Sequence, residues 1–538
     1  MPSIFISKKL SSYALICAVF ALSACFLFLN LGRYALWDDE SVSALVAVGV
    51  QRTGDTSVIL DHNIVAYRSG LLVRDGKDRS TPPLSTYLTA AAFSTFGVSA
   101  FAARLHSACF GLATVGLLLW CCRKLSLRTQ IIFSLGILGN VSLFLFCRQA
   151  RYYAAGLFFS TAIVCIYSRW KGSWRGALAM AMLGVLLFAT NYLAYAALSL
   201  CLVVDWFIWK RSEIFWNAKN LLALGLPQMI AIPLIASIWN PFGTGFGEYV
   251  AQNSIWDRVV LFFWNLRDLN GAEFLVGPLV LAGSFLAWKN RDEVLTRMLV
   301  ALVCYVGFVS LVSPQTLSNT SVADVRYLVP VIPLGIAICT FVIVKLTGGY
   351  RLLGIALALL AFQTNVINGG PFLYSGARST MAEFSREISS PLEEPYTIVS
   401  EWIRKNVQPG ESVAVFPDYM VYPLMFRVAH PIYAWQLKMG KKSRFGDVED
   451  IHFEGRRPPD FFVLFGPIVA DFLNASKHWE SKGWRYEHIA TLNTFWKDLY
   501  RPELFWRTFR PINQFDPNLE AIQVFRRKQN DSNSLVSG

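Results

Sequence analysis

Residues 11–40 read SSYALICAVFALSACFLFLNLGRYALWDDE. The part up to Leu31 is an apolar run of about 20 residues, which is the length of a membrane-spanning helix. Three consecutive carboxylates, those of Asp38, Asp39 and Glu40, follow a few residues later. Charged side chains are costly near the hydrocarbon layer and often functional there. The stretch therefore predicts a first transmembrane helix that leads to an acidic active site on the far side of a membrane.

The composition extends this prediction to most of the chain. Of 538 residues, 54% are apolar and 16% are charged, and the mean hydropathy is +0.41. About 11 stretches before residue 370 are long and apolar enough for transmembrane helices. We expect a polytopic α-helical membrane protein rather than a soluble one.

The net charge of +13 does not indicate nucleic-acid binding, because the basic residues occupy every second connection between the apolar spans. This is the distribution of cytoplasmic loops under the positive-inside rule. The basic connections contain Lys8 and Lys9; Arg123, Lys124 and Arg128; Arg169, Lys171 and Arg175; Lys210, Arg211 and Lys219; Lys289, Arg291 and Arg297; Lys345 and Arg351.

The cysteines give no framework for disulfides or a metal. All ten lie between Cys17 and Cys339, in or beside apolar spans, where they resemble small hydrophobic residues. One alternative concerns residues 22–25 (LSAC), which resemble a lipoprotein processing site. Cleavage there would remove a signal peptide. We favour an uncleaved first span, because the apolar run continues through Leu31.

The alternation of loops gives a topology with the N-terminus inside. The first outward loop covers residues 32–98 and contains a short helix at 40–50, and a second outward loop covers 240–271. An odd number of crossings then places the two termini on opposite sides. After the first span, further spans are predicted near 100–122, 130–147, 152–168, 176–193, 194–209, 219–239, 272–288, 298–313, 326–345 and 351–368.

The chain divides by composition into a transmembrane catalytic domain (1–370), a linker (371–389), an extracytoplasmic α/β domain (390–530) and a disordered tail (531–538). In the α/β domain, residues 396–407 have helical spacing, whereas 412–416 and 461–465 are short apolar runs typical of strands. We expect this domain to lie over the loop that carries the carboxylates.

Outward arginines are the second unusual feature. Residues 147–153 (CRQARYY) connect two spans on the outward side and place Arg148 and Arg151 beside Tyr152. Arg326 begins a later span. Basic residues there break the positive-inside pattern, and guanidinium groups bind phosphate oxygens in pairs. They indicate an anionic lipid head group, although purely structural pairing with Asp38, Asp39 or Asp324 is the alternative.

Carboxylates and arginines on one membrane face suit transfer of a sugar from a lipid phosphate. A carboxylate would act as general base on the acceptor hydroxyl, and arginines would neutralise the departing lipid phosphate. This chemistry needs no nucleotide. The sequence has neither a Gly-x-x-x-x-Gly-Lys phosphate loop nor a dinucleotide-binding fingerprint.

The pattern resembles the GT-C glycosyltransferases, specifically family 39, which includes protein O-mannosyltransferases and the lipid A aminoarabinose transferase. The resemblance covers roughly residues 10–345, and the order and spacing of its five pieces make it specific. They are Trp37-Asp38-Asp39-Glu40, residues 81–84 (TPPL), residues 97–105 (GVSAFAARL, which contains Arg104), residues 148–153 (RQARYY) and residues 326–330 (RYLVP).

The resemblance implies a catalytic aspartate at Asp39, with Glu40 beside it and Asp38 as the rival. Members of the family use a polyprenyl-phosphate sugar outside the cytoplasm and usually invert the anomeric carbon. Many have Lys-Pro-Pro-Leu where this chain has TPPL, preceded by a second acidic or histidine residue, for which Asp78 is a candidate.

The implied donor-binding residues are Arg148, Arg151, Tyr152, Arg326 and Arg104. The expected partners are the polyprenyl-phosphate donor, a glycan, lipid or protein acceptor and membrane lipid, without nucleic acid. No cofactor is expected. A divalent metal is undecided, with His62 and His106 as the imidazoles near the first loop. The expected location is the plasma (inner) membrane, with the active site outside the cytoplasm.

Two other functions remain open from the sequence. A polytopic transporter or lipid flippase would carry charge in the middle of its spans, whereas this chain keeps its charges at span ends and in loops. A non-catalytic membrane scaffold would tolerate Asp39→Asn. The sequence does not identify the sugar or the acceptor.

Overall fold

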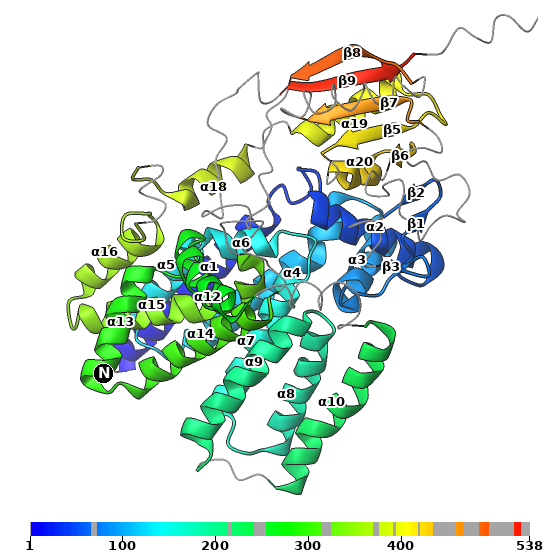
Figure 1. Cartoon of the computed structure of the whole chain (residues 1–538). Helices are drawn as coiled ribbons and strands as arrows, with labels where there is room; N and C mark the ends of the chain where they lie inside the picture. Colours follow the sequence, from blue (N-terminus) through cyan, green and yellow to red (C-terminus); the bar gives the residue numbers. More distant parts are fainter. Residues whose placement is uncertain are drawn as a thin grey trace, which may run out of the picture.

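The structure is a computed structural model, and it describes residues 2–65, 73–212, 217–240, 254–313, 324–369, 376–390, 394–417, 420–433, 458–465, 484–493 and 521–528, with side chains from residue 11 onward. Within these ranges the chain is mostly helical (Figure 1). The predicted disordered tail and part of the predicted outward loop at 240–271 lie outside the described residues.

The acidic cluster follows one helix and begins the next. The first, α1 (Pro2–Phe28), is the predicted first span. The second, α2 (Asp38–Thr53), starts with the three carboxylates, which suit the partial positive charge of a helix N-terminus. It ends at Gly54, which has a φ of +78°. Glycine adopts this left-handed conformation at low energetic cost. The helix predicted at 40–50 is confirmed and is longer at both ends.

The rest of the first loop contains two short antiparallel hairpins and one helix. The hairpins pair β1 (Ile59–Leu60) with β2 (Asn63–Ile64) and β3 (Val73–Arg74) with β4 (Lys77–Asp78). Helix α3 (Pro83–Phe96) begins at the second of two prolines, the position where a missing N–H costs least. The proline pair thus starts a helix.

A helical bundle follows, and each predicted span contains helix, although the span predicted at 272–288 is helical only from Gly277 and that at 351–368 only to Phe362. Its elements are α4 (Ala100–Cys122), α5 (Leu127–Gly139), α6 (Val141–Cys147), α7 (Tyr153–Arg169), α8 (Trp174–Phe188), α9 (Tyr192–Asp205), the π-helical turn η2 (Trp206–Lys210), α10 (Ala218–Ile238), α12 (Ile255–Gly271), α13 (Gly277–Asn290), α14 (Glu293–Val312), the 3₁₀ helix η3 (Val325–Val331), α15 (Ile332–Leu346) and α16 (Arg351–Phe362).

The predicted span at 130–147 is not one straight helix. It bends by 55° between α5 and α6. Asn140 forms the break: its side chain accepts a hydrogen bond from the Leu143 N–H (2.8 Å) and donates one to the Glu273 carbonyl (2.9 Å). The bend matters because the turn after α6 carries Arg148 and Arg151.

Six helices of the described chain are long and apolar enough to cross a membrane, or seven if α5 and α6 count as one span. Three further apolar helices, α7, α8 and α16, are shorter. The chain is thus a multi-pass helical membrane protein by the length and composition of its helices.

The C-terminal part is an α/β unit. Helices α19 (Pro395–Asn406) and α20 (Val421–Arg427) accompany a sheet with the strand order β6-β5-β7-β9-β8. Strand β5 pairs in parallel with β6 and β7, whereas β9 pairs antiparallel with β7 and β8. The strands are β5 (Val413–Phe416), β6 (Ile432–Tyr433), β7 (Phe461–Phe465), β8 (Tyr486–Asn493) and β9 (Ala521–Arg527).

The segment predicted as a linker contains a helix, α18 (Thr380–Ser389). It is amphipathic, and it buries Met381, Phe384 and Ile388 in the core of the helical bundle. At its end, the Asn30 side chain donates a hydrogen bond to the Ile388 carbonyl (2.7 Å). The segment is therefore packed onto the bundle along this helix.

The α/β unit shares a hydrophobic core with the first loop. Leu45 and Val46 of α2 belong to the same buried cluster as Tyr422 and Leu424 of α20. In Figure 1 the sheet lies above α2 and α3, away from the lower ends of α8, α9 and α10. The acidic helix α2 therefore lies between the helical bundle and the α/β unit.

Candidate active site

Asp39 is the point where three segments meet. It lies in the first turn of α2 and is 8% exposed. Its Oδ2 atom is 2.7 Å from Nη1 of Arg326 and 3.4 Å from Nη2 of Arg151. One carboxylate thus joins α2, the turn after α6 and the start of η3.

Arg326 is held from two sides. Its Nε and Nη2 atoms both lie 2.7 Å from Oδ2 of Asp324, while Nη1 contacts Asp39. The two aspartates therefore fix the plane and direction of the guanidinium. Charge-assisted pairs of this kind add geometric specificity as well as energy.

Arg151 is bound mainly to α2. Its Nη1 donates to the Ser43 hydroxyl (2.7 Å) and to the Asp39 main-chain carbonyl (3.1 Å), and the Ser43 hydroxyl donates to the same carbonyl (3.1 Å). The guanidinium carbon lies 5.2 Å from the centre of the Tyr152 ring. Burial acts to lower the pKa of Arg151, but the Asp39 carboxylate raises it above the ordinary value, so this residue stays charged.

Ser43 was not predicted as a site residue. The sequence signal was its position four residues after Asp39, which places the two residues on the same face of a helix. That signal becomes informative only when the arginine that contacts both is known.

Glu40 and Arg104 form a separate buried pair. Glu40 has no exposed surface, and Nε and Nη2 of Arg104 lie 2.8 and 2.6 Å from its two oxygens. Glu40 also accepts a hydrogen bond from the Ala150 N–H (2.6 Å). Arg104 donates further to the carbonyls of Leu31, Tyr34 and Ala35. This pair connects α2, α4 and the two neighbouring loops.

Arg148 has a similar structural position. It is 3% exposed, and its Nη1 donates to the carbonyls of Phe26 and Leu27 at the end of α1 (2.8 and 3.1 Å). A cation is favourable there, because the last carbonyls of a helix carry partial negative charge. Arg148 therefore attaches the arginine turn to the first span.

Asp38 is buried with 4% exposure, and its Oδ1 accepts a hydrogen bond from the Asp39 N–H (2.8 Å). This contact satisfies one N–H of the first helical turn. Asp38, the alternative catalytic carboxylate, therefore contributes to the local structure that holds Asp39.

Asp78 belongs to a different polar group. Its Oδ1 accepts hydrogen bonds from the N–H of Ser80 and of Thr81 (3.0 and 3.1 Å) and thereby forms the turn before α3. Next to this turn, Asp55 contacts Arg79 through both oxygens (2.8 and 2.7 Å) and Lys77 through one (2.7 Å). Within the described residues, the hydrogen-bond partners of the Asp78 side chain are Ser80 and Thr81, which lie outside the Asp39 cluster.

Of the residues predicted from the sequence, Asp39, Arg151, Tyr152 and Arg326 are brought together. Asp38 and Glu40 lie beside them with other contacts, Arg104 and Arg148 hold the surrounding backbone, and Asp78 shapes the first loop. Among the described residues there is no group of three or more His, Cys, Asp and Glu side chains that could hold a metal ion.

A bundle of apolar helices, an acidic first loop and an α/β unit that packs on this loop together make up the described part of the chain. No known protein family and no curated protein matches the chain. Among solved structures, the fold matches ArnT from Cupriavidus metallidurans bound to undecaprenyl phosphate, with a TM-score of 0.57. The identity is 14%, and the match covers 95% of this chain and 97% of that chain.

The apo state of the same ArnT matches with a TM-score of 0.54 and 16% identity, over 86% of this chain and 95% of that chain. The match to the undecaprenyl phosphate-bound structure extends over almost the full length of both proteins. The chain thus has the fold of ArnT, and the GT-C fold expected from the sequence is confirmed.

Proposed function

We propose that the chain is a membrane glycosyltransferase that moves a sugar from a polyprenyl-phosphate donor to an acceptor outside the cytoplasm. The main support is Arg151, whose buried Nε–H has no hydrogen-bond acceptor within the part of the chain that the structure describes. Buried donors almost always have a partner, and phosphate oxygens suit a guanidinium. The solved ArnT with the same fold is bound to undecaprenyl phosphate, a polyprenyl phosphate.

In the proposed reaction, the acceptor hydroxyl attacks the anomeric carbon as the bond from that carbon to the phosphate oxygen breaks. Asp39 takes the proton of the hydroxyl, and the polyprenyl phosphate departs with its charge neutralised by Arg151 and Arg326. Attack opposite the leaving group inverts the anomeric carbon. Asp39 is suited to the role of general base because this carboxylate contacts both arginines.

The remaining site residues have positioning roles in this proposal. Glu40 and Arg104 fix the backbone on which Asp39 and Arg151 lie, because Glu40 binds the Ala150 N–H next to Arg151. Arg148 fixes the same turn to α1. Tyr152 lies against the guanidinium of Arg151 and shields it from water. Asp78 shapes the loop before α3 and is a candidate for contact with the sugar.

We further propose the topology predicted from the sequence. About 11 helices cross the plasma (inner) membrane, with α13 and the shorter α7, α8 and α16 included. The carboxylates and the α/β domain (390–530) then lie outside the cytoplasm, and the transmembrane catalytic domain covers 1–370. The acceptor is a glycolipid, polysaccharide or protein. The proposed mechanism uses no cofactor, and its dependence on a divalent metal is tested by adding a chelator.

The test is sugar transfer by the purified full-length protein with a radiolabelled polyprenyl-phosphate sugar and an extract of acceptors. Loss of a general base lowers kcat by about 10²–10⁴-fold. We expect a decrease of this size for Asp39→Asn, with a smaller loss of thermal stability than Glu40→Gln causes, because Arg151 and Arg326 are more exposed than Arg104. Full transfer by this variant would refute the mechanism, whereas no transfer by the native protein with any donor would favour the non-catalytic scaffold or the transporter.

Glu40→Gln is the matched control, because it removes an equal charge from the adjacent residue. Glu40 is fully buried against Arg104, and removal of one partner of a buried ion pair costs about 3–5 kcal/mol. Glu40→Gln should therefore lower thermal stability strongly, in contrast to Asp39→Asn. Equal thermal stability of the two variants would contradict this division of roles.

The alternative function, a polytopic transporter or lipid flippase, gives a different result in the same system. Such a protein, reconstituted in vesicles, would move the lipid-linked sugar between leaflets without a chemical product. Transfer of radiolabel to an acceptor excludes this alternative, whereas movement of the intact donor without transfer supports it.

A further inference from the structure

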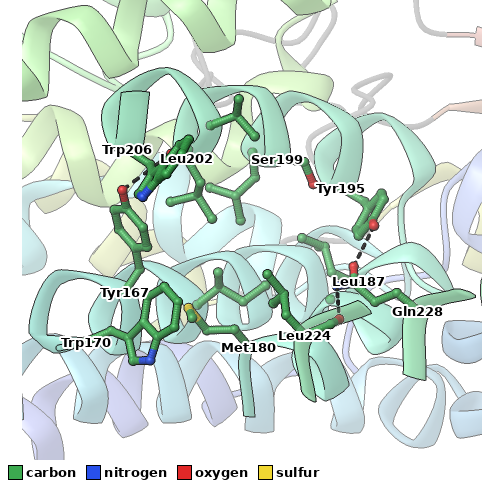
Figure 2. Close-up of a pocket in the computed structure, with 14 residues that line it drawn as sticks. Tyr167, Trp170, Met180, Leu187, Tyr195, Ser199, Leu202, Trp206, Leu224 and Gln228 are labelled. Carbon is green, nitrogen blue, oxygen red and sulfur yellow. Dashed lines mark hydrogen bonds between the residues drawn. The ribbon is translucent and has the colours of Figure 1, made fainter. Parts of the chain in front are cut away.

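A cavity of about 290 Å³ lies between α7, α8, α9 and α10. Figure 2 shows the aromatic side chains of Tyr167, Trp170 and Trp206 at one end and the pair of Tyr195 and Gln228 at the other. Three of these helices, α8, α9 and α10, form the group at the bottom of Figure 1. None of the lining residues belongs to the Asp39 cluster.

The cavity suits an apolar chain. The Tyr195 hydroxyl donates to Oε1 of Gln228 (2.6 Å), and Nε2 of Gln228 donates to the Leu224 carbonyl (2.8 Å). These polar groups therefore bind one another, which leaves mainly hydrocarbon and aromatic surface toward the space. A ligand that fills it gains from apolar burial rather than from hydrogen bonds.

The cavity also borders the outer surface of the bundle. Val203 belongs to its lining and is 61% exposed. On α10, the apolar stretch long enough to cross a membrane has no buried residue, and Met229 is 76% exposed. In a membrane such a surface contacts lipid chains. A chain can therefore enter the space sideways from the bilayer.

Basic side chains surround the end of the cavity at Trp170. Lys171, Arg175 and Lys219 are all exposed there. Arg175 and Lys219 lie 5.7 and 5.1 Å from the Trp174 ring. The Asn220 side chain donates to the Gly172 carbonyl (2.7 Å) and so holds the starts of α8 and α10 together. This basic rim is complementary to an anionic group.

We propose that the cavity binds one acyl chain of an anionic phospholipid whose phosphate lies on the rim of Lys171, Arg175 and Lys219. The donor is a different lipid in a different leaflet. Arg151 precedes the first residue of α7, whereas the rim follows the last, and the 17 residues between them span about 25 Å at 1.5 Å per residue. The inference does not depend on the proposed sugar transfer.

The test is quenching of tryptophan fluorescence by phospholipids with brominated acyl chains. The full-length protein is placed in nanodiscs that contain brominated phosphatidylglycerol or brominated phosphatidylcholine. The signal of the cavity is the difference between the native protein and Trp206→Phe. Each basic side chain near a membrane surface favours an anionic lipid by on the order of fivefold, so phosphatidylglycerol should quench this signal at a correspondingly lower mole fraction.

Two variants and a control test the site separately. Arg175→Gln combined with Lys219→Gln should abolish the preference for phosphatidylglycerol. Gly184→Leu should reduce quenching by both lipids, since a Cβ at Gly184 already lies 3.2 Å from Oε1 of Gln228 and a longer side chain fills the space. Lys289→Gln, also an exposed basic residue beside an aromatic ring, should change nothing.

Three results would overturn the proposal. One is equal quenching by the two lipids in the native protein. Another is an undiminished preference in the double variant. The third is displacement of the brominated lipid by undecaprenyl phosphate and not by unlabelled phosphatidylglycerol, which would assign the cavity to a polyprenyl chain.

Discussion

Asp39 and Glu40 are adjacent and chemically similar, yet they contact different partners. Successive residues of an α-helix point about 100° apart, because one turn takes 3.6 residues. Asp39 thereby meets Arg151 and Arg326, while Glu40 meets Arg104. The sequence predicts that acids and arginines gather here, but only the direction of each side chain on α2 assigns the pairs.

Asp324 offers a prediction at the residue scale. It binds Nε and Nη2 of Arg326 and so directs Nη1 toward Asp39. In Asp324→Asn the charge is lost while the shape is kept. We expect kcat/KM for the polyprenyl-phosphate sugar to decrease about tenfold, which corresponds to a lost positioning interaction of about 1.4 kcal/mol.

The same transfer assay measures this effect, together with a thermal melt. Asp324→Glu should recover part of the activity, since it restores the charge. Glu293→Gln is the control, because Glu293 pairs with Arg297 but is 64% exposed. Unchanged kinetics in Asp324→Asn would show that Arg326 does not depend on Asp324 for its orientation.

At the level of elements, the helices were predictable and their connections were only partly so. Apolar runs mark the spans because a membrane requires both length and hydrophobicity. The break at Asn140 depends on a contact with Glu273, 133 residues later, which no local pattern contains. Strand β8 (Tyr486–Asn493) pairs with β9 (Ala521–Arg527), which is distant in the sequence, and strand propensity depends on such tertiary neighbours more than on the local sequence.

The residues of the site were likewise predictable only where the local sequence carries the signal. Asp39, Arg151 and Arg326 were predictable because charged residues beside apolar spans are rare, and Tyr152 was named because it follows Arg151 in the RQARYY piece. Ser43 was missed, since a serine within a helix is common and is informative only through Arg151. The resemblance implied donor-binding roles for Arg104 and Arg148. In the structure Arg104 binds the Glu40 carboxylate and main-chain carbonyls, and Arg148 binds main-chain carbonyls at the end of α1.

The hairpin region of the first loop gives a pH-dependent prediction. The pKa of Asp55 lies below its ordinary value of 3.8, mainly because Arg79 donates hydrogen bonds to its carboxylate. Burial acts in the opposite direction and raises the pKa, whereas hydrogen bonds from Lys77 and from the Thr56 N–H lower it further. The folded state therefore favours the ionised carboxylate. Its stabilisation is complete above the ordinary pKa and is lost as the pH falls below about 3.8 toward the lower pKa of the folded state.

We expect Asp55→Asn to lower the free energy of unfolding by about 2 kcal/mol at pH 7, the size of charge-assisted hydrogen bonds. The difference from the native protein should shrink below pH 4. Denaturation in detergent at pH 7, 5 and 3 measures it. Asp61→Asn is the control, because Asp61 is 71% exposed in its pair with Arg52. A difference that does not vary with pH would contradict this role of Asp55.

At the scale of the whole molecule, the α/β unit and the catalytic loop fold against each other. Besides the shared apolar core, Glu394 accepts hydrogen bonds from the Ala35 N–H (3.3 Å) and from Arg427 (2.9 Å). The Asn63 side chain donates to the His430 carbonyl (3.2 Å) and accepts from the Ile432 N–H (2.7 Å). Polar contacts thus join the unit to the first loop at two places.

This arrangement predicts that damage in the α/β unit reaches α2. Leu424 of α20 is fully buried in the core that also contains Leu45 and Val46. Leu424→Ala should destabilise this core by about 3 kcal/mol, the usual cost of a buried leucine. Amide hydrogen exchange should then increase in α2 as well as in α20, because local stability follows the shared contacts.

Leu118→Ala is the matched control for this experiment. Leu118 lies on α4 in the core of the helical bundle and is 6% exposed. The same truncation there should leave hydrogen exchange in α20 unchanged. If Leu424→Ala raised exchange in α20 alone, the α/β unit would be an independent domain. If it raised exchange in both helices and also lowered sugar transfer, the position of Asp39 would depend on the packing of α20 against α2.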